Sequence, residues 1–163
     1  MPKPAGVAHT DLLVRIDPWS AAQGFYPVEA WINHAGHMRG GALRLDFAAL
    51  LAESDRTAYG LTLFYALFSG PIRAAYDQAL GYAAAHTQGR LRVRLWIAPE
   101  APELHALCWE ALHSRVGGPE GGAVAPFAVA AERPFARYLS PETPAAVEPV
   151  SGRRLRMLVV IAN

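Results

Sequence analysis

The chain has 163 residues, of which 52% are hydrophobic and 18% charged, and its formal net charge is +1. This length fits one domain, or one domain and part of a second. The apolar content excludes disorder throughout the chain. The small net charge gives no general reason to expect nucleic acid or an anionic membrane as a partner. The single cysteine excludes an intrachain disulfide and a zinc site built from several cysteines.

The sequence predicts a soluble, cytoplasmic protein. Its start, MPKPAGVAHT, lacks the long apolar core of a signal peptide. No apolar run approaches the roughly 20 residues that span a bilayer. We therefore expect no membrane partner, and no motif in the chain predicts a cofactor.

The first part of the chain reads as strands. Apolar and polar residues alternate in Tyr26–Ile32 and in Ala42–Phe47, and Asp11–Ile16 is a short apolar strand closed by a turn. Residues 33–41 form a turn-rich link. The three segments predict an antiparallel meander with one buried face.

Helical spacing follows. A short helical turn is predicted over Phe47–Ala52. A first helix then ends at Gly70, and a second begins at Pro71, which suits the first helical position because its missing N–H would be unpaired there. The predicted apolar stripes are Leu61, Phe64, Leu67 and Phe68 in the first helix, and Ile72, Tyr76, Ala79, Leu80 and Ala83 in the second.

The clearest strand is Leu91–Ile97, in which every second residue is apolar. Glu103–His113 predicts a helix with Cys108 on its apolar side. Two short extended pieces, Phe127–Ala130 and Phe135–Leu139, follow. The fold class predicted from this order is α+β, with an antiparallel sheet and a helical pair packed on it.

The last residues form a different pattern. Residues 141–153 carry prolines without periodicity and read as a linker, which divides the chain into 1–140, 141–153 and 154–163. Met157–Ala162 is apolar without alternation, as in a strand buried on both faces of a parallel sheet. Such a strand needs neighbours and covering helices, so we expect it either to join the preceding sheet or to begin a sheet completed elsewhere.

The ordered set of segments resembles the amino-terminal half of the CHAT family, the caspase- and separase-like domains often found behind tetratricopeptide repeats. The segments that carry the resemblance are Leu63–Tyr76, Leu91–Ile97, Leu104–Leu112, Phe135–Leu139 and Leu155–Asn163. The last segment is similar to the first strand of the caspase-like α/β sheet. A departure is Cys108, which stands where the family has a proline before its Trp-Glu pair.

The resemblance implies a non-catalytic amino-terminal portion of a protein whose parent is similar to a cysteine peptidase. The family's catalytic histidine and cysteine follow later strands, so no catalytic residue is carried over to this chain. The expected partners are the rest of the caspase-like domain or a separate protein. The alternative is a self-sufficient interaction module without enzymatic activity, which would use Phe135–Leu139 and exposed tryptophans as its contact surface.

Four residues are candidates for a structural or interaction role. Trp109 is expected to be buried where helix meets sheet. Glu110 is expected either to pair with an arginine such as Arg137 or to remain a solvated carboxylate. Tyr138, beside Arg137, completes the set.

Other constellations have plainer interpretations. Cys108 with His105 could form a catalytic thiol pair, but a cysteine among leucines is more often an inert core residue. His34 and His37 are too few for a stable metal site and suit a turn. His105 and His113 lie about two turns apart on the predicted helix, too far to join Cys108 around one zinc ion.

A basic patch is a further possibility. Arg92 and Arg94 share one strand face with Trp96, and Arg15 and Arg44 could lie beside them. Such a patch could bind an acidic tail or single-stranded nucleic acid. A solvated sheet face with local ion pairs is the alternative, and the small net charge favours it over nucleic acid.

Overall fold

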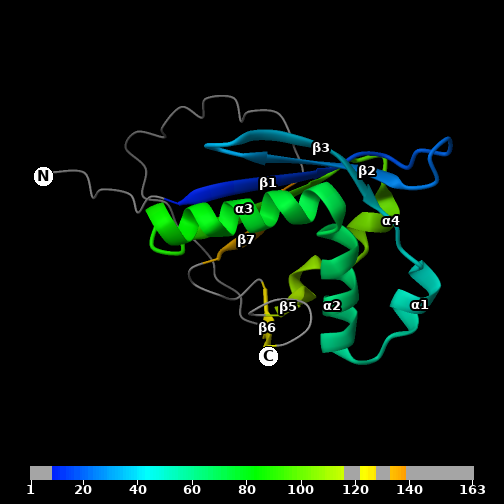
Figure 1. Cartoon of the computed structure of the whole chain (residues 1–163). Coiled ribbons are helices and arrows are strands. Elements are labelled where there is room, and N and C mark those ends of the chain that lie inside the picture. Colours follow the sequence, from blue (N-terminus) through cyan, green and yellow to red (C-terminus); the bar gives the residue numbers. More distant parts are fainter. Residues whose placement is uncertain (1–8, 116–121, 128–132, 139–163) are drawn as a thin grey trace, which may run out of the picture.

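A mixed sheet forms the centre of the fold. The structure, a computed structural model, describes residues 9–115, 122–127 and 133–138. In this part of the chain, five strands lie in the order β3-β2-β1-β4-β7 (Figure 1). Their bounds are β1 Thr10–Ile16, β2 Tyr26–Ile32, β3 Gly36–Leu43, β4 Leu91–Ile97 and β7 Phe135–Tyr138.

Strand directions divide the sheet into two halves. The pairs β1–β2 and β2–β3 are antiparallel, so the predicted meander is confirmed. The pairs β1–β4 and β4–β7 are parallel, so the prediction of an antiparallel sheet was wrong for this half. The helices between β3 and β4 carry the chain back across the sheet to the edge of β1 that β2 does not occupy. Such a crossover produces a parallel pair. The α+β class holds.

β3 begins earlier than the alternation predicted. It starts at Gly36 and includes most of the link over residues 33–41. Gly41 allows α3 (Gly70–His86) to approach closely, because a Cβ atom at position 41 would lie 2.4 Å from Cγ1 of Ile72. The glycine-rich segment was interpreted as a turn, although Gly41 serves the packing of a strand.

The bounds of the helices are α1 Phe47–Ala52, α2 Arg56–Leu67, α3 Gly70–His86 and α4 Pro102–His105. α1 has the predicted bounds, and α2 ends and α3 begins close to the predicted positions, whereas α4 is much shorter than the predicted helix. The carboxylates of Asp46 and Asp55 cap the first turns of α1 and α2 by accepting from backbone N–H groups. Pro71 lies in the first turn of α3, as predicted. None of the helices in the described ranges combines the length and apolar character needed to cross a membrane.

The predicted helix over Glu103–His113 is wrong. After α4 the chain forms a 3-10 turn, η1 (Trp109–Ala111), and then strand β5 (His113–Arg115), which pairs with β6 (Val124–Pro126) in a second small sheet. Backbone hydrogen bonds to the residue three positions earlier, such as the one from the Ala111 N–H to the Cys108 carbonyl oxygen, replace those of a regular α-helix. The break places Leu107, Trp109 and Leu112 all in the core, although they share no single helical face.

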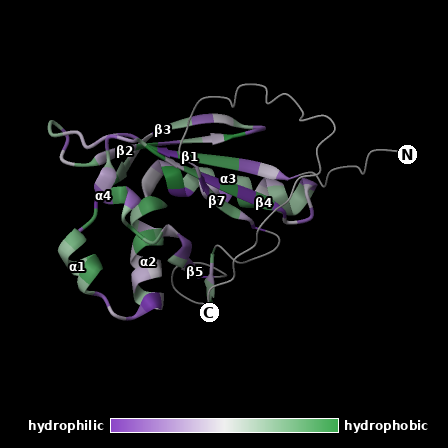
Figure 2. Cartoon of the chain, turned by 180° about the vertical axis from the view of Figure 1, so that it is seen from behind, coloured by the Kyte–Doolittle hydropathy of each residue, from purple (hydrophilic) through white to green (hydrophobic). Residues whose placement is uncertain are grey.

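Helices cover one face of the sheet. Alternate residues of β1, β2 and β4 are buried against the helices, and α3 lies along the sheet while α2 runs down toward β5 (Figure 1). Phe127 closes the core between Phe64, Phe68 and Tyr76, with ring centroids 5.3–5.9 Å away. Seen from behind in Figure 2, no helix of the described residues lies over the opposite face.

Several predicted features lie outside the described residues. These are residues 128–130 of the Phe127–Ala130 piece, the linker over residues 141–153 and the strand Met157–Ala162.

Candidate functional site

Trp109 is a core residue, as predicted. Its side chain is fully buried, and its indole N–H donates to the carbonyl oxygen of Leu104 at 2.8 Å. The ring joins α4, η1 and the main core cluster. Its role in the described chain is therefore to hold the segment after β4 against the helices.

Glu110 pairs with Arg137. Nη2 of Arg137 lies 3.2 Å from Oε1 of Glu110, and Nη1 donates to the carbonyl oxygen of His105 at 3.1 Å. The Glu110 side chain is 54% exposed, so the ion pair is worth about 0–1 kcal/mol. Arg137 thus connects strand β7 to the segment that carries Trp109.

Cys108 is exposed, so its predicted place in the core was wrong. Because α4 ends at His105, the helical stripe that would have buried Cys108 does not form. In the described ranges no hydrogen bond joins this thiol to a histidine; a ring nitrogen of His105 contacts the Ala98 carbonyl at 3.1 Å and Nδ1 of His113 contacts the Ala111 carbonyl at 2.8 Å. This geometry does not activate a nucleophile.

The two candidate histidines, His34 and His37, contact different neighbours. His37 stacks on Trp31 at 4.2 Å between ring centroids and contacts Glu29 at 3.1 Å. His34 stacks on Tyr82 of α3 instead. Partial desolvation, and then the nearby charge of His86, lower the pKa of His34. The described ranges contain no group of three side chains suited to hold a metal ion.

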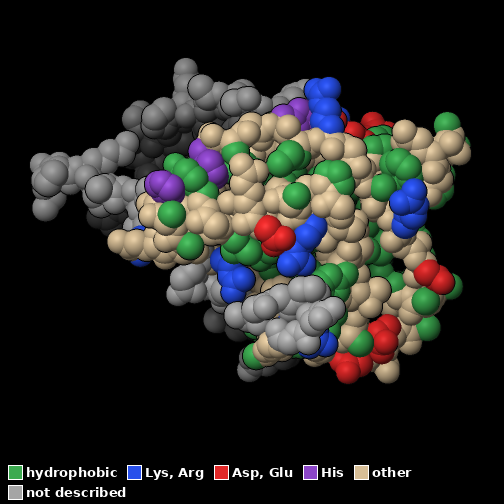
Figure 3. Space-filling view, in the orientation of Figure 1, with side chains coloured by type: hydrophobic (Ala, Val, Ile, Leu, Met, Phe, Trp, Pro, Cys, Tyr) green, Lys and Arg blue, Asp and Glu red, His purple; other side chains and the backbone are tan. Residues whose placement is uncertain are grey.

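The uncovered face of the sheet is the best candidate for a functional surface. Strand registers align its side chains in cross-strand rows. The first row is Trp31, Leu13 and Arg94, and the second is Glu29, Arg15, Trp96 and Tyr138. By contrast, Figure 3 shows the helical side, where acidic and basic side chains are dispersed among apolar and small ones.

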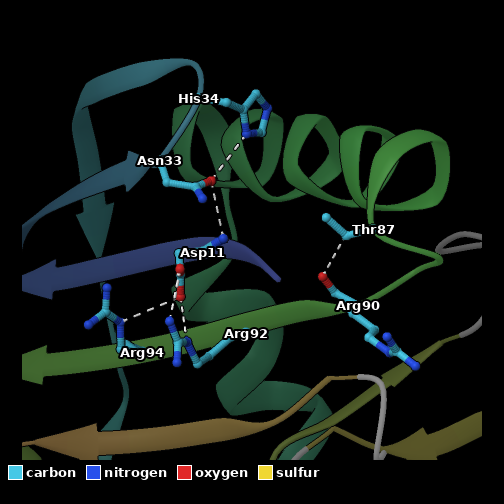
Figure 4. Close-up of polar contacts among 7 residues, drawn as sticks. All are labelled: Asp11, Asn33, His34, Thr87, Arg90, Arg92 and Arg94. Atoms are coloured by element: carbon cyan, nitrogen blue, oxygen red, sulfur yellow. Dashed lines mark hydrogen bonds and ion pairs between the residues drawn. The ribbon is translucent and has the colours of Figure 1, made fainter. Parts of the chain in front are cut away.

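Asp11 organises the charges at one end of this face (Figure 4). Arg92 donates to both of its carboxylate oxygens, at 2.5 and 2.9 Å. This bond raises the pKa of Arg92. The backbone N–H of Asp11 donates to Oδ1 of Asn33 at 3.2 Å. Asp11 of β1 is thus bonded both to β4 and to the turn after β2.

Arg94 shares Asp11 with Arg92. Its Nε atom is 3.9 Å from the Asp11 oxygen to which Nε of Arg92 donates, and in the described part of the chain this Nε atom has no hydrogen bond. The side chain is 42% exposed. It lines a depression of about 330 Å³, whose other lining residues are Asp11, Leu13, Trp31, Ile32 and Asn33.

Further donors lie in the second row. The Arg15 guanidinium carbon is 4.6 Å from the ring centroid of Trp96, a cation–π contact. Trp96 is 5% exposed, and its indole N–H has no acceptor. Burial raises the pKa of Tyr138, and the nearby charge of Arg94 opposes that shift. Arg44 does not join this face, because its guanidinium lies over Phe25.

Sequence reasoning predicted part of this surface. Arg15, Arg92, Arg94 and Trp96 were named together, whereas Asp11, Leu13 and Trp31 were missed. Their signal was present in the alternation, since each lies between two buried residues of its strand or beside one. The pairing of β1 with β4 was needed to bring them beside the arginines.

Comparisons of the chain with family models, with curated proteins and with solved structures found no match in any of the three. The resemblance to the CHAT family therefore stays a prediction from the order of the sequence segments.

Proposed function

We propose that this chain is a non-catalytic docking layer: the amino-terminal portion of a CHAT domain-containing protein, on which the rest of the caspase-like domain or a separate protein assembles. The assignment to such a parent rests on the order of segments from Leu63 to Asn163. The docking role is supported by one observation, the sheet face over which no helix of the described residues lies.

The composition of that face supports binding of protein. Trp31, Leu13 and Arg94 form a continuous row, with Arg15 and Tyr138 in the next. Aromatic residues and arginine are the types enriched in the contact centres of protein interfaces. Asp11 and Glu29 lie among the arginines of this face, so its charge is mixed, whereas nucleic acid needs a continuous basic surface for its phosphates.

A second candidate is a self-sufficient interaction module. The observation that favours it is the core, which extends from Leu12 to Phe127 with Phe135 packed against it. Of the tryptophans considered for its contact surface, Trp96 and Trp109 are buried and Trp31 is partly buried, whereas Trp19 is 50% exposed. Trp19 and Trp31 are therefore the ones available to a partner.

Removal of Leu155–Asn163 separates the two candidates. If this segment begins a sheet completed elsewhere, the shortened chain should keep its melting temperature and become more soluble, because a bare apolar strand promotes aggregation. If the segment completes the module's own sheet, the shortened chain should unfold at a lower temperature. Solubility and thermal unfolding measure both, and removal of residues 1–8 is the matched control. Unchanged solubility and stability would contradict the docking-layer proposal.

A further inference from the structure

The two arginines beside Asp11 are paired unequally, and among the described residues Arg94 has only a long ion pair without a hydrogen bond. Asp11 accepts two bonds from Arg92, whereas its contact with Arg94 is an ion pair at 3.9 Å. A guanidinium offers five N–H donors and accepts none. Arg94 can therefore receive a further carboxylate without displacing a bond of comparable strength.

The residues around Arg94 determine which further groups a ligand of this site can carry. Leu13 and Trp31 supply apolar surface to the same depression, and Asn33 adds a polar rim (Figure 4 shows Asn33 and Arg94 on either side of Asp11). In the neighbouring row, the Trp96 indole N–H has no acceptor among the described residues, but it is buried and therefore not open to a ligand. Arg94 is thus the donor that this depression offers, next to apolar side chains.

We propose that Arg94 and the depression floored by Leu13 and Trp31 bind an acidic segment of a protein partner, with a carboxylate on Arg94 and a neighbouring apolar side chain on Leu13 and Trp31. This inference rests on the proposed docking role of the sheet face. The open form of the depression favours a protein segment over a small acid, since small molecules bind in sites that enclose most of their surface.

The test uses the full chain with an acetylated and amidated peptide of alternating leucine and glutamate. The readout is the set of indole N–H signals in a nitrogen-15 correlation spectrum, with Trp31→Phe used to assign the signal of Trp31. We expect the Trp31 signal to shift on titration. A matched peptide with glutamine in place of glutamate should bind about tenfold more weakly or not at all. Equal binding of the two peptides would overturn the proposal.

Three variants test the charge arrangement. Arg94→Gln should weaken binding of the acidic peptide about tenfold. Asp11→Asn should strengthen it, because a negative charge beside Arg94 is removed. Arg73→Gln is the control, since Arg73 pairs with Asp77 on α3 and lies outside the sheet face. Circular dichroism verifies that each variant is folded. A merely structural role of Arg94 would not produce opposite effects from Arg94→Gln and Asp11→Asn.

Other ligands are outcomes of the same titration. If acetate alone, at the same carboxylate concentration, shifts the Trp31 signal equally, the site takes a free acid and the protein segment is excluded. Binding of oligo(dT) that depends on Arg94 would likewise overturn the proposal. If Arg94→Gln has no effect while Leu13→Asp abolishes peptide binding, the docking face stands and the carboxylate site falls. If neither variant matters, the proposed docking face fails as well.

Discussion

At the scale of single residues, Trp109 joins parts of the chain that are separate in the sequence. Its buried indole bonds to Leu104 and packs in the core shared with the helices. Trp109→Ala should lower the free energy of unfolding by about 3–5 kcal/mol, as expected for removal of a buried aromatic side chain. Urea denaturation measures the change. Leu51→Ala is the control, because Leu51 is 70% exposed and should change stability by no more than about 0.5 kcal/mol. Similar effects of both substitutions would contradict this role.

His34 gives a prediction about pH. Its pKa is lowered from 6.5 by partial desolvation and by His86. The unfolded chain therefore binds a proton more readily than the folded chain, and folding should lose stability as the pH falls from above 6.5 through the lowered pKa. Nuclear magnetic resonance titration should place the His34 midpoint below 6.5. His86→Gln should raise that midpoint, and an unchanged midpoint would exclude the effect of His86.

Individual residues also show where prediction from the sequence ended. The Glu110–Arg137 pair was predicted as one of two alternatives and is present. The exposure of Cys108 and the long contact of Arg94 with Asp11 were not predicted. The first depends on where a helix ends, and the second depends on which arginine Asp11 binds across two strands that are 81 residues apart. Neither choice is local.

At the scale of elements, alternation located two strands well but placed the third at Ala42–Phe47, whereas β3 is Gly36–Leu43. The bounds of β2 and β4 match the predicted segments, as do those of α1. The segment after β4 was misread because its leucines and Trp109 are spaced as on a helix, although tertiary packing divides them among α4, η1 and β5. The parallel pairing of β1 with β4 could not be read from either strand alone, because it depends on the path of the helices between them.

Two helical glycines make a matched pair at this scale. A Cβ atom at Gly60 of α2 would lie 2.0 Å from the Ala111 carbonyl oxygen, whereas one at Gly81 of α3 would meet nothing within 4 Å. Gly60→Ala should therefore destabilise the fold by about 1–3 kcal/mol. Gly81→Ala should stabilise it by about 0.5–1 kcal/mol, since alanine loses less backbone entropy in a helix. Thermal unfolding of both variants checks the opposite signs, and equal signs would contradict the close approach of α2 to η1.

At the scale of the whole molecule, the sheet order predicts a gradient of stability. β1 has hydrogen-bonded neighbours on both edges and is covered by α3, whereas β3 lies at one end of the described sheet. Amides of β1 should exchange with solvent most slowly, and those of β3 faster, because edge strands open locally at lower cost. Hydrogen–deuterium exchange measures this order. Faster exchange in β1 than in β3 would be incompatible with the strand order.

The parallel contact between β1 and β4 also constrains how the chain folds during its synthesis. The meander of β1, β2 and β3 can form once residue 43 has left the ribosome. The other edge of β1 can pair only after β4, which begins at Leu91, has been synthesised. At about 5–20 residues per second, that edge remains open for several seconds. A nascent chain that stalls within α3 therefore presents an apolar strand with one unpaired edge, the kind of surface that chaperones recognise.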